Sequence, residues 1–487
     1  MSTEKSPSRK SRAIVWFRKD LRVKDNPALV AAYNAKKEIV PVFIWNEKEG
    51  GQWSPGAASR WWLHQSLIDL GKSIDSNNGK LILRKGIAEY ILPLIAKVVG
   101  ADTVFFNRSY DPAGRQTEIS VKDALSRNGI QCESFNGSLL NEPWEIKNGS
   151  GKPYQIFTPY WKLSRSGIHK KPTCYEPSKF TFSKDNSPTE SLHELGLLTE
   201  HPWHEKLHSH WIVSEDEGHK MISRTTQEVT RHYSHRRNIP SINGTSRLSP
   251  YLAWGNISPR QICQAVLHSH SNDDPTSTDG NQFLAEIGWR EFSYHLLYHF
   301  PHLPENPLRP KYAEFPWRKD AQALSNWQLG KTGYPLVDAG MRQLYETGWM
   351  HNRVRMVVAS FLVKHLLMSW TEGTKWFWDT LVDADLASNT QGWQWAAGCG
   401  ADAAPYFRIF NPILQGEKFD TSGKYARRWI EPLKELPSKW LFKPWEAPTI
   451  VLSQSNVTLG QNYPQPCVDH PQARARALEA LATLPKN

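Results

Sequence analysis

The stretch "AIVWFRKDLRVKDNPALVAAYNAKKEIVPVFIW" (13–45) decides the fold class. Its apolar run "AIVWF" (13–17) predicts a buried strand, and "EIVPVFIW" (38–45) predicts a second one. The segment between them, "NPALVAAYNA" (26–35), predicts a helix. Two short apolar strands joined by a helix indicate a parallel strand pair with a helical crossover.

The same alternation continues as far as residue 136. We expect helices at 56–74, 88–101 and 118–129, and strands at 80–84, 103–107 and 131–136. This order predicts a doubly wound, Rossmann-like parallel sheet, and so an α/β domain over residues 12–136. Such sheets bind ligands beyond the carboxyl ends of their strands. Neither GxGxxG nor a P-loop motif occurs, which excludes an ordinary dinucleotide-binding or P-loop domain.

Three further segments complete the predicted organisation. Residues 1–11 are basic and polar, which predicts a disordered tail rather than a secretory signal. Periodicity fades over residues 137–215, where Pro, Ser and Lys gather, so we expect an inter-domain linker. From residue 216 to residue 487 the pattern is almost entirely helical, which predicts an all-α domain.

The composition restricts the classes of function. The formal net charge of +11 favours a polyanionic partner such as nucleic acid, although charge alone is a weak indicator. The apolar runs are too short for a membrane span. Five scattered cysteines indicate a reducing cytosol without a disulfide framework, and no metal-ligand spacing is present.

The segment "GTSRLS" (244–249) places hydroxyl groups at a predicted loop-to-helix junction. Free backbone N–H groups at such a junction favour an anion, and Arg237 and Arg247 add positive charge. Capping of the helix by Ser and Thr explains the pattern equally well. The motif alone therefore indicates no more than a phosphate group.

The segment "FLAEIGWREF" (283–292) pairs a carboxylate with a tryptophan. Glu286 and Trp289 are three residues apart, so they are neighbours on one helix face, whereas we expect Arg290 and Glu291 elsewhere around the helix. A carboxylate beside a tryptophan suits a flat ligand with hydrogen-bonding edges. A tryptophan at the edge of a domain core is the simpler alternative.

Two apolar helical segments carry buried polar groups, "GWMHNRVRMVVASFLVKHLL" (348–367) and "LVDADLASNTQGWQWAAG" (381–398). Buried charges must be paired, and Arg355 with Asp383 is the natural pair. Polar groups here without a metal pattern indicate hydrogen bonds to a large polar cofactor. A purely structural buried ion pair is the alternative.

Trp393 and Trp395 lie two residues apart in one predicted helix. Side chains with that spacing diverge by about 200° around the helix axis, so the two rings cannot share a face. We therefore expect them to serve two different environments. Nine of the 22 tryptophans fall within residues 281–400, a clustering that a large core does not obviously explain.

Taken together, these motifs resemble the DNA photolyase and cryptochrome family over roughly residues 12 to 446. The resemblance rests on "WFRKDLRVKDNPAL" (16–29), "GTSRLSPYLAWG" (244–255), "WREF" (289–292), "GKTGYPLVDAGMRQL" (330–344), residues 348–367 and "WQWAAGCGADAAPYFRIFNP" (393–412). It implies an FAD cofactor in the all-α domain. By motif position, the residues along the FAD phosphates and ribitol would be Tyr233, Thr245, Ser246, Arg247, Leu248 and Ser249.

The resemblance also implies contacts to the flavin ring. Arg355, Asp383 and Asp385 would hold the isoalloxazine and adenine side, and Asn389 would face flavin N5. Plant-type cryptochromes carry Asp at that last position, so Asn389 favours a repair enzyme.

Within the family, the lesion pocket separates the substrates. Enzymes for (6-4) lesions use two histidines where this chain has Asn352 and Met356, which are similar to the cyclobutane pyrimidine dimer enzymes. Glu286 would hydrogen-bond the thymine edges, and Trp289 and Trp395 would pack against the flipped dimer. The resemblance thus implies four catalytic residues: Glu286, Asn352, Met356 and, at the flavin, Asn389.

The remaining tryptophans have roles in the same family. Trp393, Trp370 and Trp317 match its electron-transfer chain, which reduces FAD in light and is separate from repair. The segment "GAASRWWLHQSL" (56–67) is similar to class III bacterial enzymes, whose antenna is methenyltetrahydrofolate, so Trp61 or Trp62 would stack on it. Gly114 stands where class I folate-binding enzymes carry Glu, which leaves 8-hydroxy-5-deazaflavin or no antenna open.

The function implied is light-driven repair of cyclobutane pyrimidine dimers in DNA by a cytoplasmic, bacterial, monomeric enzyme. A blue-light cryptochrome photoreceptor is the alternative function.

Overall fold

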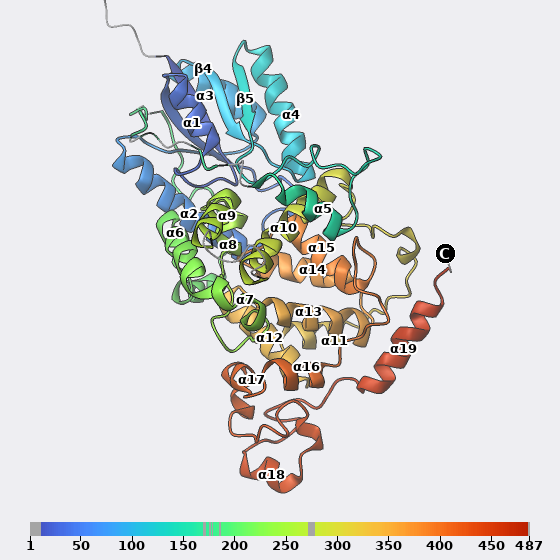
Figure 1. Cartoon of the computed structure of the whole chain (residues 1–487). Coiled ribbons are helices and arrows are strands. Elements are labelled where there is room, and N and C mark those ends of the chain that lie inside the picture. The colour runs from blue at the N-terminus through green and yellow to red at the C-terminus, as the bar shows by residue number, and fades with distance from the viewer. Residues whose placement is uncertain are drawn as a thin grey trace, which may run out of the picture.

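The computed structural model of the chain describes residues 11–168, 172–174, 177, 179–184, 187–270 and 278–485. The predicted tail, apart from Ser11, lies outside the described residues. Figure 1 shows an α/β unit at one end of the molecule and a larger helical unit below it. Of the helices described, none is long and apolar enough to cross a membrane.

The α/β unit contains one sheet of parallel strands in the order β3-β2-β1-β4-β5. The strands are β1 (Arg12–Phe17), β2 (Glu38–Trp45), β3 (Ile82–Lys85), β4 (Ala101–Asn107) and β5 (Gln131–Phe135). Alternate residues of β1 enter two different cores: Val15 packs on one face and Ile14 on the other. Because both faces are covered, β1 and β2 are apolar apart from their first residues, as the opening stretch predicted, whereas the edge strands β3 and β5 also carry polar side chains.

Two helices cover each face of the sheet. They are α1 (Pro27–Asn34), α2 (Ala57–Ser76), α3 (Ala88–Val99) and α4 (Pro112–Arg127). α1 and α2 contribute to the core shared with the helical unit, and α3 and α4 pack on the opposite face. α4 begins at Pro112 rather than at residue 118, because Asp111 caps it by accepting a hydrogen bond from the N–H of Gly114.

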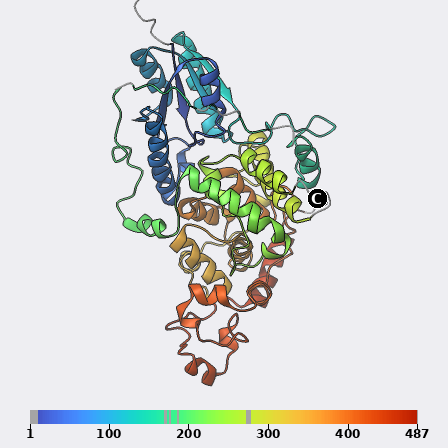
Figure 2. The same cartoon turned by 60° about the vertical axis from the view of Figure 1, so that its left-hand side comes forward.

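The predicted linker, 137–215, contains regular structure of its own: α5 (Phe157–Arg165) and a 3₁₀ helix, η3 (Pro202–Ser209). Its later part follows the edge of the sheet, where the N–H of Ser183 donates to Ile39 and that of Glu190 to Leu83. Figure 2 shows the chain passing along the outside of the α/β unit before it enters the helical unit. The domain bounds themselves stay a prediction.

The first helix of the helical unit starts at Glu215. Its helices are α6 (Glu215–Arg224), α7 (Tyr233–Arg236), α8 (Ser249–Ala253), α9 (Pro259–Ser269), α10 (Thr278–His299), α11 (Ala321–Gln328), α12 (Pro335–Thr347), α13 (Asn352–Ser360), α14 (Trp370–Thr380), α15 (Leu386–Ala397), α16 (Pro412–Phe419), α17 (Lys424–Trp429), α18 (Thr449–Gln454) and α19 (His470–Ala482). The single helix expected over 348–367 is α13 followed by a π-helical turn, Phe361–His365, and His351 caps its start.

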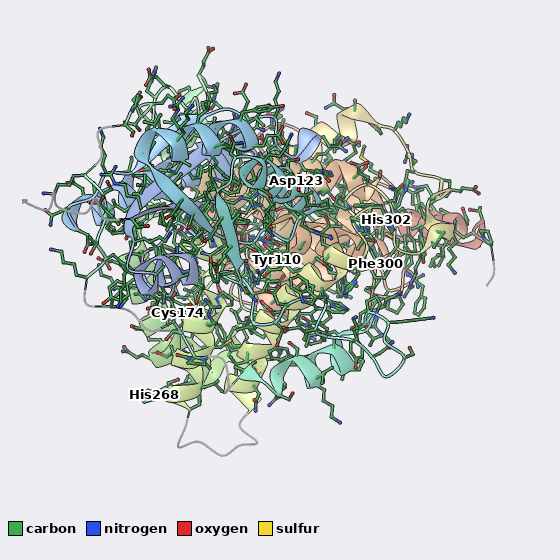
Figure 3. The ribbon with its side chains drawn as sticks, turned by 90° about the horizontal axis from the view of Figure 1, so that it is seen from above. Tyr110, Asp123, Cys174, His268, Phe300 and His302 are labelled. Atoms are coloured by element: carbon green, nitrogen blue, oxygen red, sulfur yellow. The ribbon has the colours of Figure 1, made fainter. Side chains whose placement is uncertain are left out.

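Buried hydrogen bonds join the two units. The carboxylate of Glu291 on α10 accepts from the N–H groups of Leu140 and Asn141, which follow β5. The ring of Tyr110, which follows β4, lies edge-on against Tyr294 of α10, and Figure 3 shows Tyr110 near the middle of the molecule. These contacts attach α10, which carries the predicted Glu286–Trp289 pair, to the sheet.

Candidate functional site

A cavity of about 590 Å³ lies inside the helical unit. Its lining contains every residue predicted from the sequence to contact the cofactor or the lesion, together with Trp393. These side chains come mainly from α8, α10, α13 and α15 and from the loops before α8 and α15. Segments more than 100 residues apart in the chain therefore build one site.

Asp383 organises one corner of the cavity. It accepts hydrogen bonds from the hydroxyl of Ser249 at 2.7 Å and from the guanidinium of Arg355 at 2.8 and 3.1 Å. The ion pair expected between Arg355 and Asp383 is therefore present. One buried carboxylate fixes α8, α13 and the loop before α15 relative to one another.

Asp385, two residues later, is engaged differently. It caps α15 by accepting from the N–H of Ser388, and the hydroxyl of Tyr294 donates to its other oxygen. Burial, and then the charge of Asp385, raises the pKa of Tyr294 well above its usual value, so this hydroxyl keeps its proton and donates. Asp385 thereby ties α15 to α10.

Positive charge gathers at the cavity wall nearest α8. Arg247 adopts a left-handed backbone conformation (φ 56°) and its guanidinium lies 4.8 Å from the ring centre of Trp349. Strained backbone of this kind clusters at binding sites. Burial, and after it the charges of Arg353, Arg355, Arg247 and Arg237, lowers the pKa of His351 to about 3. His351 is thus neutral at ordinary pH beside a cluster of arginines, and this electrostatic setting suits a diphosphate.

Hydrogen bonds from Arg224 fix the loop 245–246. The guanidinium of Arg224 on α6 donates to the carbonyl groups of Thr245 and Ser246, at 3.1 and 3.3 Å. Thr245 and Ser246 both line the cavity, and each carries a hydroxyl group that can donate a hydrogen bond. The donor set therefore fits phosphate oxygens, as the "GTSRLS" segment indicated.

The wall on α10 carries the pair predicted for the lesion. Glu286 accepts from the guanidinium of Arg237 at 2.5 Å and from the amide of Gln282 at 3.4 Å. Arg290, which we expected elsewhere around the helix, also lines the cavity. That expectation was wrong because Arg290 is four residues after Glu286, a spacing that places both on one face.

Trp289 is supported by an aromatic column from α5. Its ring stacks on Phe157 with centroids 3.7 Å apart and planes at 7°, and Phe157 is parallel to Trp161 at 6.3 Å. Gly288 allows this approach, because a Cβ there would lie 2.5 Å from the ring of Trp161. A helix of the predicted linker therefore positions a wall of the cavity.

Trp393 and Trp395 occupy different surroundings, as their spacing predicted. Trp393 is 2% exposed and lies against Phe377 at 5.0 Å, with its six-membered ring over Gly373 of α14. Trp395 is half-buried and lines the cavity. Asn389, one helical turn before Trp393, donates from its amide to the carbonyl of Thr374 at 3.0 Å. An amide has a second donor and an acceptor, which leaves it capacity toward a ligand.

Trp370 and Trp317 lie outside the cavity lining. Trp370 is buried at the start of α14, one turn from Gly373, on which Trp393 packs. The chain next to Trp317 pairs with the segment before α14, since the N–H of Arg318 donates to the carbonyl of Leu367 at 2.7 Å. Trp370 and Trp393 thus meet at α14, Trp317 lies beside a residue paired with the segment before α14, and the role of all three stays a prediction.

Trp61 and Trp62 are both 0% exposed on α2. The indole N–H of Trp61 donates to His208, and that of Trp62 donates to Asn256 at 2.9 Å. A chromophore stacked on either ring would have to displace a packed neighbour such as Tyr251, whose ring centre lies 5.0 Å from that of Trp62. The antenna assignment stays a prediction.

Sequence reasoning missed several residues of the site. Arg290 could have been found from its spacing to Glu286, and Trp349 from its place in the 348–367 motif. Phe157 and Arg224 gave no signal, because each acts through a contact to a distant segment.

Comparison with known proteins identifies the family to which this chain belongs. A model described as the FAD binding domain of DNA photolyase matches residues 283–483, and a model described as DNA photolyase matches residues 13–178. The chain is 46% identical over 476 residues to a deoxyribodipyrimidine photo-lyase of Agrobacterium fabrum, covering 97% of this chain and 98% of that protein. The chain belongs to the DNA photolyase and cryptochrome family.

Solved structures and other members of the family agree with that assignment. A class III photolyase from Agrobacterium tumefaciens superimposes with a TM-score of 0.94 at 45% identity, covering 99% of both chains. Cryptochrome-2 of Arabidopsis thaliana is 40% identical over 484 residues, covering 97% of this chain and 79% of that protein. The relatives of this chain within the family therefore include both repair enzymes and cryptochromes.

Proposed function

We propose that this protein repairs cyclobutane pyrimidine dimers in DNA by light-driven electron transfer from reduced FAD to a flipped-out dimer. The observation that carries the proposal is the single cavity, in which the residues assigned to the flavin and those assigned to the lesion share one space. A volume of about 590 Å³ lies within the range of cofactor sites.

The residues present fit an FAD molecule. Hydroxyl groups and arginines on the α8 side match the diphosphate, whereas Asp383, Arg355 and Asn389 offer hydrogen bonds to a polar ring edge. The chemistry that bound, reduced FAD supplies is a light-excited electron donor, which splits the cyclobutane ring by lending it an electron.

The protein's own residues position the dimer and exclude water. Trp289 and Trp395 offer apolar faces for stacked bases, and Met356 adds an apolar contact. The Glu286 carboxylate, oriented by Arg237, is an acceptor for the N–H groups of the two bases. Asn352 is exposed on α13, where its amide can reach a base edge.

The positive charge of the chain serves the approach to DNA. With a net charge of +11, binding to phosphates is expected to be largely independent of sequence and to weaken as salt rises. Specificity for the lesion then comes from the cavity, since a dimer that pairs poorly is easier to flip out than an intact base pair.

A repair assay tests the proposal. Purified protein with chemically reduced flavin is mixed with an oligonucleotide that contains one thymine dimer, and intact thymines are counted after blue light and after darkness. We expect repair only in light. Absence of repair with fully reduced flavin bound would overturn the proposal.

A blue-light photoreceptor is the second candidate, favoured by the 40% identity to Arabidopsis Cryptochrome-2 along nearly the whole chain. The same assay separates the two functions. Flavin that is reduced by blue light in a protein without repair activity would favour the photoreceptor.

The antenna is a separate part of the proposal. We propose methenyltetrahydrofolate, with 8-hydroxy-5-deazaflavin or no antenna as alternatives, and Trp61 or Trp62 as the neighbouring ring. Mass spectrometry of chromophores extracted from the purified protein decides between them. Recovery of flavin alone would remove the antenna from the proposal.

A further inference from the structure

The loop that follows α15 contains a residue in a backbone conformation that side chains rarely adopt. Asp402 has a φ of 46°, in the left-handed region. Asn and Asp tolerate this region better than other residues with a side chain, yet it is uncommon and occurs where the surrounding structure requires it. The Asp402 carboxylate accepts a hydrogen bond from the N–H of Phe157 at 3.2 Å, across 245 positions of sequence.

Helix α5 begins at Phe157 without a capping side chain of its own. The residue before it is Ile156, which makes no capping hydrogen bond through its side chain. The first N–H groups of a helix have no partner within the helix, and an acidic group near them is favourable. Asp402 therefore supplies, from a distant segment, the cap that the sequence next to α5 lacks.

The same loop is attached to the cavity wall on α15. The side-chain amide of Gln391 donates to the carbonyl of Ala401 at 2.9 Å, and Gln391 lines the cavity. Gln391 precedes Trp395 by four residues, a spacing that places both side chains on one face of α15. Hydrogen bonds thus connect the wall that carries Trp395, through Ala401 and Asp402, to the start of α5.

The ring of Phe157 completes the connection, because it stacks on Trp289 of α10. Helix α10 lies against both α5 and α15, and Figure 1 shows the three helices together. The two tryptophans assigned to the lesion, Trp289 and Trp395, are therefore linked by contacts that run outside the cavity.

We propose that Asp402 is a positioning residue for recognition of the dimer. By capping α5 it fixes the ring of Trp289 relative to that of Trp395, and so favours two linked bases over a single flipped-out base. Rings held in a fixed relative position select by size, because a ligand that is too small leaves part of the contact unmade. This role rests on the proposed function and extends it to a residue outside the cavity lining.

The effect of Asp402 is local to the first turn of α5. The other end of the helix is attached separately, since Asn141 donates to the hydroxyl of Ser164 at 2.8 Å. Residues 400–403 also line a second cavity of about 540 Å³, so the loop is not packed on every side. Loss of the Asp402 carboxylate should therefore release the turn that carries Phe157 without detaching the helix.

Three substitutions separate the carboxylate from the backbone conformation. Asp402→Asn keeps an oxygen acceptor and a residue that tolerates the left-handed region. Asp402→Gly removes the acceptor but relieves the backbone, whereas Asp402→Ala removes the acceptor and keeps the strain. The proposal requires that Asp402→Asn behave as the original protein and that Asp402→Gly and Asp402→Ala both fail.

Hydrogen exchange and DNA binding measure the two parts of this role. With FAD bound and no DNA present, amide exchange in the peptide that contains Phe157 should rise several-fold in Asp402→Gly and Asp402→Ala. The ratio of affinities for dimer-containing and undamaged DNA should fall about 2- to 10-fold, as for loss of one aromatic stack. Asp469→Ala, which removes the cap of α19 away from the cavity, is the matched control and should change neither quantity.

A double variant tests whether Asp402 acts through Phe157. Asp402→Gly combined with Phe157→Leu should lose no more affinity for dimer-containing DNA than Phe157→Leu alone, because both changes act on one ring. Additive losses, unchanged exchange in Asp402→Gly, or full dimer preference in Asp402→Gly would each overturn the proposal. An unsubstituted protein without preference for dimer-containing DNA would overturn the proposed function itself, and this role with it.

Discussion

The same residue types form two contrasting polar clusters in this molecule. At the carboxyl ends of β1 and β4, where parallel sheets usually bind ligands, Arg18 pairs with Glu118 at 2.5 Å and with Glu49 at 3.4 Å. Glu118 also accepts from the N–H of Ser109, and Gly114 leaves no room, since a Cβ there would lie 2.4 Å from Ser109. The charged groups of this cluster are therefore paired with one another.

In the helical unit, Asp383, Arg355 and Ser249 are also joined by hydrogen bonds, but of the three only Asp383 is buried, and they occupy one corner of a large cavity. Aromatic rings on α10 and α15 hold the rest of the space open. The difference teaches that a polar cluster becomes a binding site when rigid apolar walls prevent the surrounding chain from closing on it. The doubly wound sheet here serves as support for the helical unit.

The strongest test of this contrast removes one carboxylate from each cluster. Asp383→Ala and Glu118→Ala should both destabilise the protein, each by about 3 kcal/mol, because each leaves an arginine without its buried partner. Only Asp383→Ala should also lose FAD. Urea unfolding measures the stability, and the ratio of flavin to protein absorbance after purification measures the cofactor.

Either of two results would contradict the contrast. The first is a folded Glu118→Ala protein that is purified without flavin, and the second is an Asp383→Ala protein with full flavin occupancy. In the first case the sheet edge would be part of the cofactor site, and in the second the corner at Asp383 would be structural only.

The next largest effect separates binding of the lesion from binding of the flavin within the cavity. Glu286→Ala should keep FAD and slow repair about 10- to 150-fold, because a hydrogen bond to a charged group contributes about 1.5–3 kcal/mol. Initial repair rates with pre-reduced protein measure the effect. Glu228→Ala, an exposed carboxylate elsewhere in the helical unit, is the control. Repair at the original rate would remove Glu286 from the active site.

The sequence was most informative where one element determines the geometry alone. The strands of the opening stretch could be predicted because their apolar side chains had to be buried on both faces. The divergence of Trp393 from Trp395 followed from helix geometry, and the Arg355–Asp383 pair from the cost of a buried charge. The family resemblance supplied the other predicted residues that line the cavity.

Long-range packing set the limit of that prediction. The stack of Phe157 on Trp289 joins residues 132 positions apart, and no local pattern indicates it. Segment 137–215 lacked periodicity, yet α5 within it forms because its apolar residues pack on α10. The burial of Trp61 and Trp62 likewise depends on partners far along the chain, His208 and Asn256.

A third test uses residues outside the cavity. Trp317→Phe should slow reduction of oxidised flavin by light several-fold, because it removes the outermost tryptophan of the predicted chain. Repair by pre-reduced protein should be unchanged, since Trp317 does not line the cavity. Flavin absorbance under blue light with an external reductant measures the first quantity. Trp203→Phe is the matched control, and loss of repair in Trp317→Phe would contradict the division of roles.

The smallest expected effect concerns the cavity wall that the linker supplies. Phe157→Leu keeps an apolar residue on α5 but removes the ring stacked on Trp289. The stack should contribute about 0.5–1.5 kcal/mol beyond burial, so affinity for dimer-containing DNA should fall about 2- to 10-fold. Affinity for undamaged DNA should not change, because phosphate contacts dominate it.

Phe442→Leu is the matched control for this last test, since Phe442 is equally buried but packs against Gly416, in a different part of the helical unit. It should cost comparable stability without any change in lesion affinity. Equal loss of affinity for damaged and undamaged DNA in Phe157→Leu would show that α5 contributes to general DNA binding. In that case α10 alone would position Trp289 in the cavity wall. The contrast with the closed edge of the sheet would then depend on the helical unit and not on α5 of the linker.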